Sequence, residues 1–249
     1  MENASLINVS RQESLTRALD VIANNIANAN TTGFKAERVL FEPIVQRPAE
    51  ALDGPEDITF VNDYGLVRDF TPGGLDTTGG TLDFALEGPG FFVVQTGETD
   101  NGPTRYTRDG RFQLDSEGRL ATGSGALVLN PAGQPIQLEA EQGRVEVDTD
   151  GVIRQNDQQV GQIAVVVFES LSPLEKIGDN LYEAPAGADP DPAVQPGVRQ
   201  GVIERANVEI IREITRMIEA SRAYSSAQGF TDDQDELRTR TIQRLGRAN

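Results

Sequence analysis

The chain has 249 residues, 37% of them apolar and 6% aromatic, and its 22 Lys and Arg against 39 Asp and Glu give a formal net charge of −17. A chain of this length can bury a substantial core, and its acidic balance argues against nucleic-acid binding, which requires a basic surface. Cysteine and histidine are absent, which excludes disulfides, thiol chemistry and the side chain most often used as general base or metal ligand.

The helix-breaking residues are confined to the middle of the chain. All 13 Pro and 23 of the 25 Gly lie between Gly33 and Gly201. Because Pro costs a helix interior roughly 3 kcal/mol and Gly about 1 kcal/mol, we predict an α+β fold with paired terminal helices around a β-rich, hairpin-built body. The predicted domains are a discontinuous helical assembly domain (1–35 plus 203–249), an extended, irregular connector (36–80) and a β-rich outer domain (81–202).

The N-terminal arm carries an apolar stripe with the spacing of a helix that packs on another helix. Its members follow 3-4-3-4 spacing, with two flanking residues that widen the stripe: Leu15, Ala18, Ile22, Asn25 and Ala29, flanked by Leu19 and Ile26. Asn24, Asn25 and Asn28 are poor helix formers, so their side chains either face solvent or cap the helix, or their amides bond across helices in an assembled bundle. Gly33 follows the stripe, where a C-terminal cap favours glycine.

The body reads as short strands separated by turns. The Asp109-Gly110 pair predicts a hairpin between the strands on either side of it. Residues 112–120 and 145–153 share one pattern, apolar-x-apolar-Asp-hydroxyl-acid-Gly-x-apolar, which predicts two similar hairpins in one sheet system. Residues 148–151 are similar to the start of a calcium loop, but Gln159 occupies the twelfth position, where that loop needs an acidic ligand. We therefore expect no metal, no cofactor and no catalytic site.

The C-terminal arm is predicted to be helical over residues 208–245, beginning at a cap on Asn207. Ile210, Ile214, Met217, Ser221 and Tyr224 step 4-3-4-3, flanked by Ile211 and Ile218. Such a helix would be roughly 57 Å long at about 1.5 Å per residue, longer than a small domain can cover. The spacing agrees equally with packing against other subunits and with a two-helix hairpin that closes on itself. Gly229 is a possible kink.

Several segments resemble the flagellar rod and hook protein family. Residues 23–35, Ala-Asn-Asn-Ile-Ala-Asn-Ala-Asn-Thr-Thr-Gly-Phe-Lys, are similar to its N-terminal signature, and residues 206–211 and 217–224 are similar to its C-terminal signature. Residues 86–92 and 106–112 are similar to its shared core. The match runs through nearly the whole chain, and its length and its segments 35–38 and 242–246 favour the proximal rod type.

The resemblance implies that both arms join a helical layer lining a tubular rod, with the β body outside. Partners would be copies of the chain, other rod proteins and, in transit, the flagellar type III export apparatus. The location would be the basal body in the periplasmic space, reached without a cleaved signal peptide. The stripes and signature positions together give the predicted assembly residues: Leu15, Leu19, Ile22, Asn24, Asn25, Ile26, Asn28, Gly33 and Phe34 in the N-terminal arm, and Asn207, Ile210, Ile211, Ile214, Met217, Ile218, Arg222 and Tyr224 in the C-terminal arm.

Two other interpretations remain open at this point. One is a distal rod or hook subunit of the same family. The other is a β-rich, carbohydrate-active enzyme with oligomerisation helices, which would need two carboxylates facing each other across a cleft. We expect a structural protein that is not an enzyme and that has no nucleic acid and no small-molecule substrate among its partners.

Overall fold

The computed structural model describes residues 2–46, 58–97, 102–139 and 143–246. The chain divides into two compact units. Unit 1 comprises Met1–Ala27, Glu37–Asp69 and Glu209–Asn249, and unit 2 comprises Asn28–Ala36 and Phe70–Val208. The described helices lie in unit 1 and most of the strands in unit 2, which confirms the α+β prediction. Among the described residues, no helix combines the length and the apolar character needed to cross a membrane.

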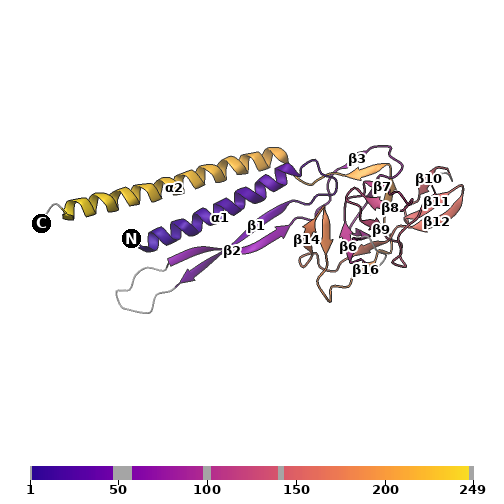
Figure 1. The fold of residues 1–249 in the computed structure, drawn as a ribbon, viewed down its shortest axis with the longest axis horizontal. Coiled ribbons are helices and arrows are strands. Elements are labelled where there is room, and N and C mark those ends of the chain that lie inside the picture. Colours follow the sequence, from indigo (N-terminus) through magenta and orange to yellow (C-terminus); the bar gives the residue numbers. More distant parts are fainter. Residues whose placement is uncertain (1, 47–57, 98–101, 140–142, 247–249) are drawn as a thin grey trace. The chain divides into compact units, whose positions relative to one another are not determined.

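Unit 1 is built on two long helices that lie side by side (Figure 1). Helix α1 spans Glu2–Ala27 and α2 spans Ile210–Gly246. They are antiparallel, because Asn8 Nδ2 donates to Ala227 O at 2.7 Å whereas Asn25 Nδ2 lies 3.3 Å from Glu213 Oε2. Gly229, a possible kink by sequence, does not interrupt α2, which is one continuous helix through it. One glycine costs only about 1 kcal/mol, which packing along the rest of the helix outweighs.

Unit 1 also contains a long β-hairpin. Strands β1 (Glu37–Gln46) and β2 (Ile58–Arg68) pair antiparallel from Glu37↔Arg68 to Gln46↔Ile58, with a bulge after Leu40, and both strands contact α1. The prediction of an irregular connector over 36–80 is therefore wrong for these strands. Pro43 lies within β1, and a proline argues against a strand in the sequence because it cannot donate a hydrogen bond to a neighbouring strand. The hairpin accommodates it because both strands of a two-stranded sheet are edge strands. Residues 47–57 of that connector lie outside the described residues.

Unit 2 is an assembly of short strands. Its main sheet has the order β14-β15-β6-β5-β9-β8-β7, with β13 joining β5 and β16. A three-stranded sheet β10-β11-β12 and the pairs β17–β4 and β18–β3 complete it. The strands are β3 Leu75–Thr77, β4 Phe84–Leu86, β5 Phe91–Gln95, β6 Thr104–Thr107, β7 Phe112–Leu114, β8 Leu120–Thr122, β9 Leu127–Val128, β10 Val145–Val147, β11 Val152–Gln155, β12 Gln158–Gln162, β13 Val165–Val167, β14 Glu175–Gly178, β15 Leu181–Glu183, β16 Asp191–Pro192, β17 Val198–Gln200 and β18 Val202–Glu204.

Strand β5 separates two hydrophobic clusters of unit 2. Phe92 and Val94 point into one cluster and Phe91 and Val93 into the other, as the two-residue repeat of a strand requires. All four side chains are buried. In the second cluster, the rings of Phe91 and Tyr182 meet edge to face with centroids 5.7 Å apart. The core of unit 2 is therefore formed on both faces of its central strand.

The repeated Asp-containing pattern forms two hairpins with the same turn, as predicted. Asp115 Oδ1 accepts hydrogen bonds from the backbone N–H groups two and four residues later, and Asp148 Oδ1 does the same, all at 2.8–3.0 Å. Gly118 and Gly151 adopt φ values of 78° and 76°. The prediction of one sheet system is wrong, because the first hairpin belongs to the main sheet and the second to the three-stranded sheet.

The predicted hairpin around Asp109-Gly110 is also wrong. Strand β6 pairs with β5 and β15, whereas β7 pairs with β8. The Asp109 carboxylate instead accepts from the N–H of Arg111 at 3.0 Å, and Gly110 O accepts from Phe84 N at 2.9 Å. A Cβ at Gly110 would lie 1.8 Å from Phe84 O. The glycine is thus required by close backbone approach rather than by a hairpin turn.

Candidate functional site

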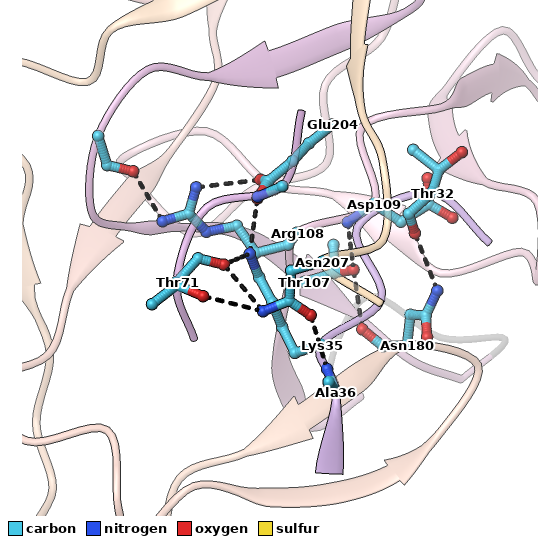
Figure 2. A network of polar contacts seen from close by, with 12 residues as sticks. Thr32, Lys35, Ala36, Thr71, Thr107, Arg108, Asp109, Asn180, Glu204 and Asn207 are labelled. Carbon is cyan, nitrogen blue, oxygen red and sulfur yellow. Dashed lines mark hydrogen bonds and ion pairs between the residues drawn. The ribbon is translucent and has the colours of Figure 1, made fainter. Parts of the chain in front are cut away.

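Unit 2 holds a buried network of charges where the chain enters and leaves it (Figure 2). Glu204, at the end of β18, is 1% exposed and accepts from Lys35 Nζ at 2.6 Å and from Gly73 N at 2.9 Å. Its second oxygen lies 3.3 Å from Arg108 Nη1. Lys35 and Arg108 are also buried. Breaking such a buried cluster by removing one partner leaves an uncompensated charge, which costs about 3–5 kcal/mol.

The same network ties together segments that are far apart in sequence. Lys35 Nζ also donates to Thr71 O at 2.9 Å, and Asn207 Nδ2 donates to the same oxygen at 3.1 Å. Asn207 Oδ1 in turn accepts from Ala36 N at 2.8 Å. We call Lys35, Thr71, Arg108, Glu204 and Asn207 the crossing node. Figure 2 shows its side chains converging from these separate segments.

Gly33 and Phe34 pack inside unit 2 beside the crossing node. Gly33 N donates to Glu204 O at 2.8 Å, and φ at Gly33 is +68°. A Cβ there would lie 2.4 Å from the Arg108 carbonyl carbon, so only glycine fits. The Phe34 ring is 1% exposed, and Lys176 Nζ lies 4.2 Å from its centroid, a cation–π distance. Gly33 is therefore not a helix cap, because α1 ends at Ala27.

Burial shapes the electrostatics around Arg108. Desolvation lowers the pKa of its guanidinium, and the Glu204 carboxylate opposes that shift. Arg108 Nη2 donates to Gly88 O at 2.8 Å, and its guanidinium carbon lies 5.4 Å from the Phe91 centroid. Burial likewise raises the pKa of the neighbouring Asp109 carboxyl, against a hydrogen bond from Arg111 N that lowers it. Within the network, the opposite charges of Lys35, Arg108 and Glu204 hold one another in place.

In unit 1, Asn25 joins three elements. Its side chain is 1% exposed and bonds both backbone groups of Glu37, donating to the O at 2.8 Å and accepting from the N at 3.0 Å. Its Nδ2 also lies 3.3 Å from the carboxylate of Glu213 on α2. Glu37 in turn pairs with Arg68 of β2 at 3.0 Å. Asn25 therefore neither faces solvent nor caps the helix, and its amide bonds α2 and β1 of its own chain rather than a neighbouring subunit.

The face of α2 that meets α1 coincides only in part with the predicted seam. The inward residues are mostly small or polar: Glu213 and Ala227 are buried, and Met217, Ala220, Tyr224 and Thr231 are half-buried. Met217 and Tyr224 belong to the predicted seam, whereas Ile210 and Ile214 lie to one side of this face. We call Ile210, Ile211, Ile214 and Ile218 the Ile stripe, and these side chains are 40%, 82%, 44% and 48% exposed. The helix therefore leaves much of the surface of its isoleucines outside the contact with α1.

The remaining predicted residues are distributed as follows. Leu15, Leu19, Ile22, Ile26 and Asn28 are half-buried, whereas Asn24 and Arg222 are exposed. Asn207 does not cap α2, because the helix begins at Ile210 and Glu213 N donates to Glu209 O. Glu204, Arg108 and Glu213 were not predicted. Their partners lie 169, 96 and 188 residues away, and no local pattern in the sequence indicates such pairs.

The described residues contain no group of three or more acidic side chains arranged to hold a metal ion. A shallow groove of about 650 Å³ runs along α1 and is lined by α1 side chains and Tyr224. Its walls mix Val9 and Val21 with charged groups such as Glu13 and Asp20. Among the described residues, the Ile stripe and this groove are candidate contact surfaces in unit 1, and the crossing node is a buried network in unit 2.

Three protein-family profiles match the chain. Residues 6–35 match the family described as "Flagella basal body rod protein", residues 85–155 match "Flagellar hook protein FlgE/F/G D1 domain", and residues 199–244 match "Flagellar basal body rod FlgEFG protein C-terminal". The Ile stripe and Gly33 lie within the two terminal matches, and Arg108 lies within the central one.

The chain is also similar over its length to several flagellar proteins. It is 44% identical over 249 residues to the flagellar basal-body rod protein FlgF of Caulobacter vibrioides, covering 100% of both chains. It is 34% identical to the FlgF of Mesorhizobium japonicum, covering 99% of both. It is 36% identical to the flagellar basal-body rod protein FlgG of Bacillus subtilis, covering 92% of this chain and 94% of that one.

Proposed function

The chain belongs to the flagellar basal-body rod protein family, and on that premise we propose that it assembles through its terminal helices into a tube that transmits torque. It is a structural subunit of the basal-body rod. The proposal is that the Ile stripe of α2 packs against neighbouring axial subunits, which are copies of this chain and other rod proteins. The observation that carries it is the exposure of four isoleucines on one helix.

The energetics support burial of the Ile stripe in an assembly. Fully burying an isoleucine is worth about 1.5–3 kcal/mol, and these side chains are 40–82% exposed. Covering all four would therefore contribute on the order of 3–6 kcal/mol per subunit contact. That contribution is repeated for each subunit, so many modest contacts would give a stiff tube.

The predicted assembly residues divide into three groups in this proposal. The exposed ones, the Ile stripe with Asn24 and Arg222, contact neighbouring subunits directly. The half-buried ones contribute the exposed part of their side chains to contacts with neighbouring subunits: Leu15, Leu19, Ile22, Ile26, Asn28, Met217 and Tyr224. The third group acts inside the chain: Asn25 holds unit 1 together, and Gly33, Phe34 and Asn207 anchor the chain segments in unit 2.

A proximal position in the rod is supported by the similarity to a FlgF protein over 100% of both chains. The similarity to a FlgG protein covers 92% of this chain and 94% of that one. We further propose that the chain passes through the flagellar type III export apparatus without a cleaved signal peptide and resides in the periplasmic part of the basal body. We propose no catalytic activity and no small-molecule ligand. Family membership supports each of these points.

The test replaces two isoleucines of the stripe in a strain that lacks its own copy. Ile214→Asp combined with Ile218→Asp is expected to abolish incorporation into isolated basal bodies, leaving truncated rods and loss of motility. The control is Ser226→Asp, which places the same charge on the same helix at an exposed position outside the stripe. Intact, motile flagella from the double variant would overturn the proposal.

A further inference from the structure

The chain passes between the two units at four peptide bonds, which join residues 27/28, 36/37, 69/70 and 208/209. Members of the crossing node stand within two residues of three of these links. Lys35 precedes the second, Thr71 follows the third and Asn207 precedes the fourth. The node therefore lies where tension on those links first reaches the interior of unit 2.

We propose that the crossing node shares load, so that tension on one of these three chain links is distributed to the other two and to the body. Four hydrogen bonds define the sharing. Lys35 and Asn207 both donate to Thr71 O, and Glu204 accepts from Lys35 and from Gly73 N. Arg108 then connects Glu204 to Gly88 O within the body. Figure 2 shows the bonds from Lys35 and Arg108 meeting at the Glu204 carboxylate, and those from Lys35 and Asn207 meeting at Thr71.

The first and last of these segments are also bonded directly to each other. Gly33 N donates to Glu204 O at 2.8 Å, and Asn207 N donates to Phe34 O at 3.4 Å. The partners advance along both segments in the same direction, so the two segments are parallel here. Tension drawn from the two chain termini enters at residue 28 and at residue 208. It therefore pulls the segments past each other and loads their contacts together.

The type of contact also matters for resistance to sliding. Hydrogen bonds and ion pairs weaken steeply when their geometry changes, so they oppose displacement along the segments. Apolar contacts are non-directional and permit sliding while the buried area stays constant. A node built from bonds to one carboxylate is therefore expected to resist tension more strongly than an apolar cluster of equal thermodynamic stability.

Single-molecule force spectroscopy on the full-length chain, held by tags at both termini, tests this proposal. The first variant is Lys35→Met, which removes the contacts from Lys35 to Glu204 and Thr71. The second replaces all three charges, by Lys35→Met, Arg108→Met and Glu204→Met, because apolar substitution of a whole buried ion cluster often preserves equilibrium stability. The control is Leu120→Ala, a fully buried position of the unit 2 core that lowers stability without touching the node.

After α1 separates from α2, Lys35→Met is expected to unfold unit 2 at a lower rupture force, with an early small step as the N-terminal segment detaches. Leu120→Ala should keep the wild-type rupture force of unit 2 despite an equal or larger drop in its urea midpoint. The triple variant should keep its urea midpoint and lose rupture force. Rupture forces that simply follow the urea midpoints across the variants would overturn the proposal. The measurement uses monomers, so its outcome is independent of whether the Ile stripe mediates assembly.

Discussion

Asn25 offers a sharp test of how unit 1 is held together. Replacing it by alanine removes one side chain that satisfies both the N–H and the C=O of Glu37. Each buried backbone group left without a partner costs about 1–3 kcal/mol. Alanine offsets part of this loss, because it is a better helix former than asparagine by up to about 0.7 kcal/mol. We expect Asn25→Ala to lower the free energy of unfolding of unit 1 by roughly 2–5 kcal/mol.

The adjacent Asn24 supplies a matched control, since it lies on the same helix and its side chain is exposed. Asn24→Ala makes the same change in helix propensity and leaves the Glu37 bonds intact. Urea titration followed by circular dichroism at 222 nm reports on unit 1, because the described α-helices lie there. Asn25→Asp keeps the acceptor for Glu37 N but places a carboxylate beside Glu213, so it should be at least as damaging. Equal midpoints for Asn25→Ala and Asn24→Ala would refute the reasoning.

Two further predictions concern unit 2. Gly33→Ala should destabilise unit 2 far more than Gly79→Ala in thermal melts. Both glycines have φ near +70°, so both substitutions carry the backbone strain of about 1–3 kcal/mol. Only at Gly33 would the added Cβ also lie 2.4 Å from the Arg108 backbone. Burial raises the pKa of Asp109, so the native state binds that proton more tightly than the unfolded chain, and the resulting stabilisation is lost as the pH rises from the unfolded pKa through the native pKa. Asp109→Asn, which can still accept from Arg111, should therefore raise the urea midpoint at pH 7, with a gain that shrinks toward pH 3.8; a gain that is constant with pH would contradict this.

The two terminal helices could be predicted from the sequence because their signal is local. Both helices lack Pro, Gly occurs in them only at positions 229 and 246, and their apolar residues repeat with 3-4 spacing. These features can be recognised from neighbours within two turns. Which face each helix would cover could not be predicted. The orientation of α2 depends on Asn8 and Asn25 bonding it from α1, and α1 in turn contacts a hairpin that Pro43 made hard to recognise. One residue corresponds to a rotation of about 100° around a helix. An error of one residue in the predicted seam therefore changes which side chains are expected to be buried.

The crossing node lay beyond the reach of sequence patterns for a different reason. Lys35 belonged to a recognised signature, yet its partner Glu204 is one acid among 39 acidic residues. Only the fold determines which carboxylate is buried beside it. The two turns that begin at Asp115 and Asp148 are the opposite case, because their hydrogen bonds are local in sequence. Asp115 and Asp148 bond to backbone groups two and four residues away, so the similarity of the two hairpins could be predicted while their placement in separate sheets could not.

The arrangement of side chains on α2 argues for assembly more strongly than helix length alone. A helix pair that is complete in itself places its largest apolar side chains between the helices, because burial is worth more for isoleucine than for alanine. Helix α2 places Glu213, Ala220 and Ala227 toward α1 together with the larger Met217 and Tyr224, and leaves the Ile stripe 40–82% exposed. Small inward residues let α1 approach closely, and Asn25 and Asn8 supply directional bonds that fix the pairing. The apolar area left outside is then available to a neighbour, as the proposed assembly requires.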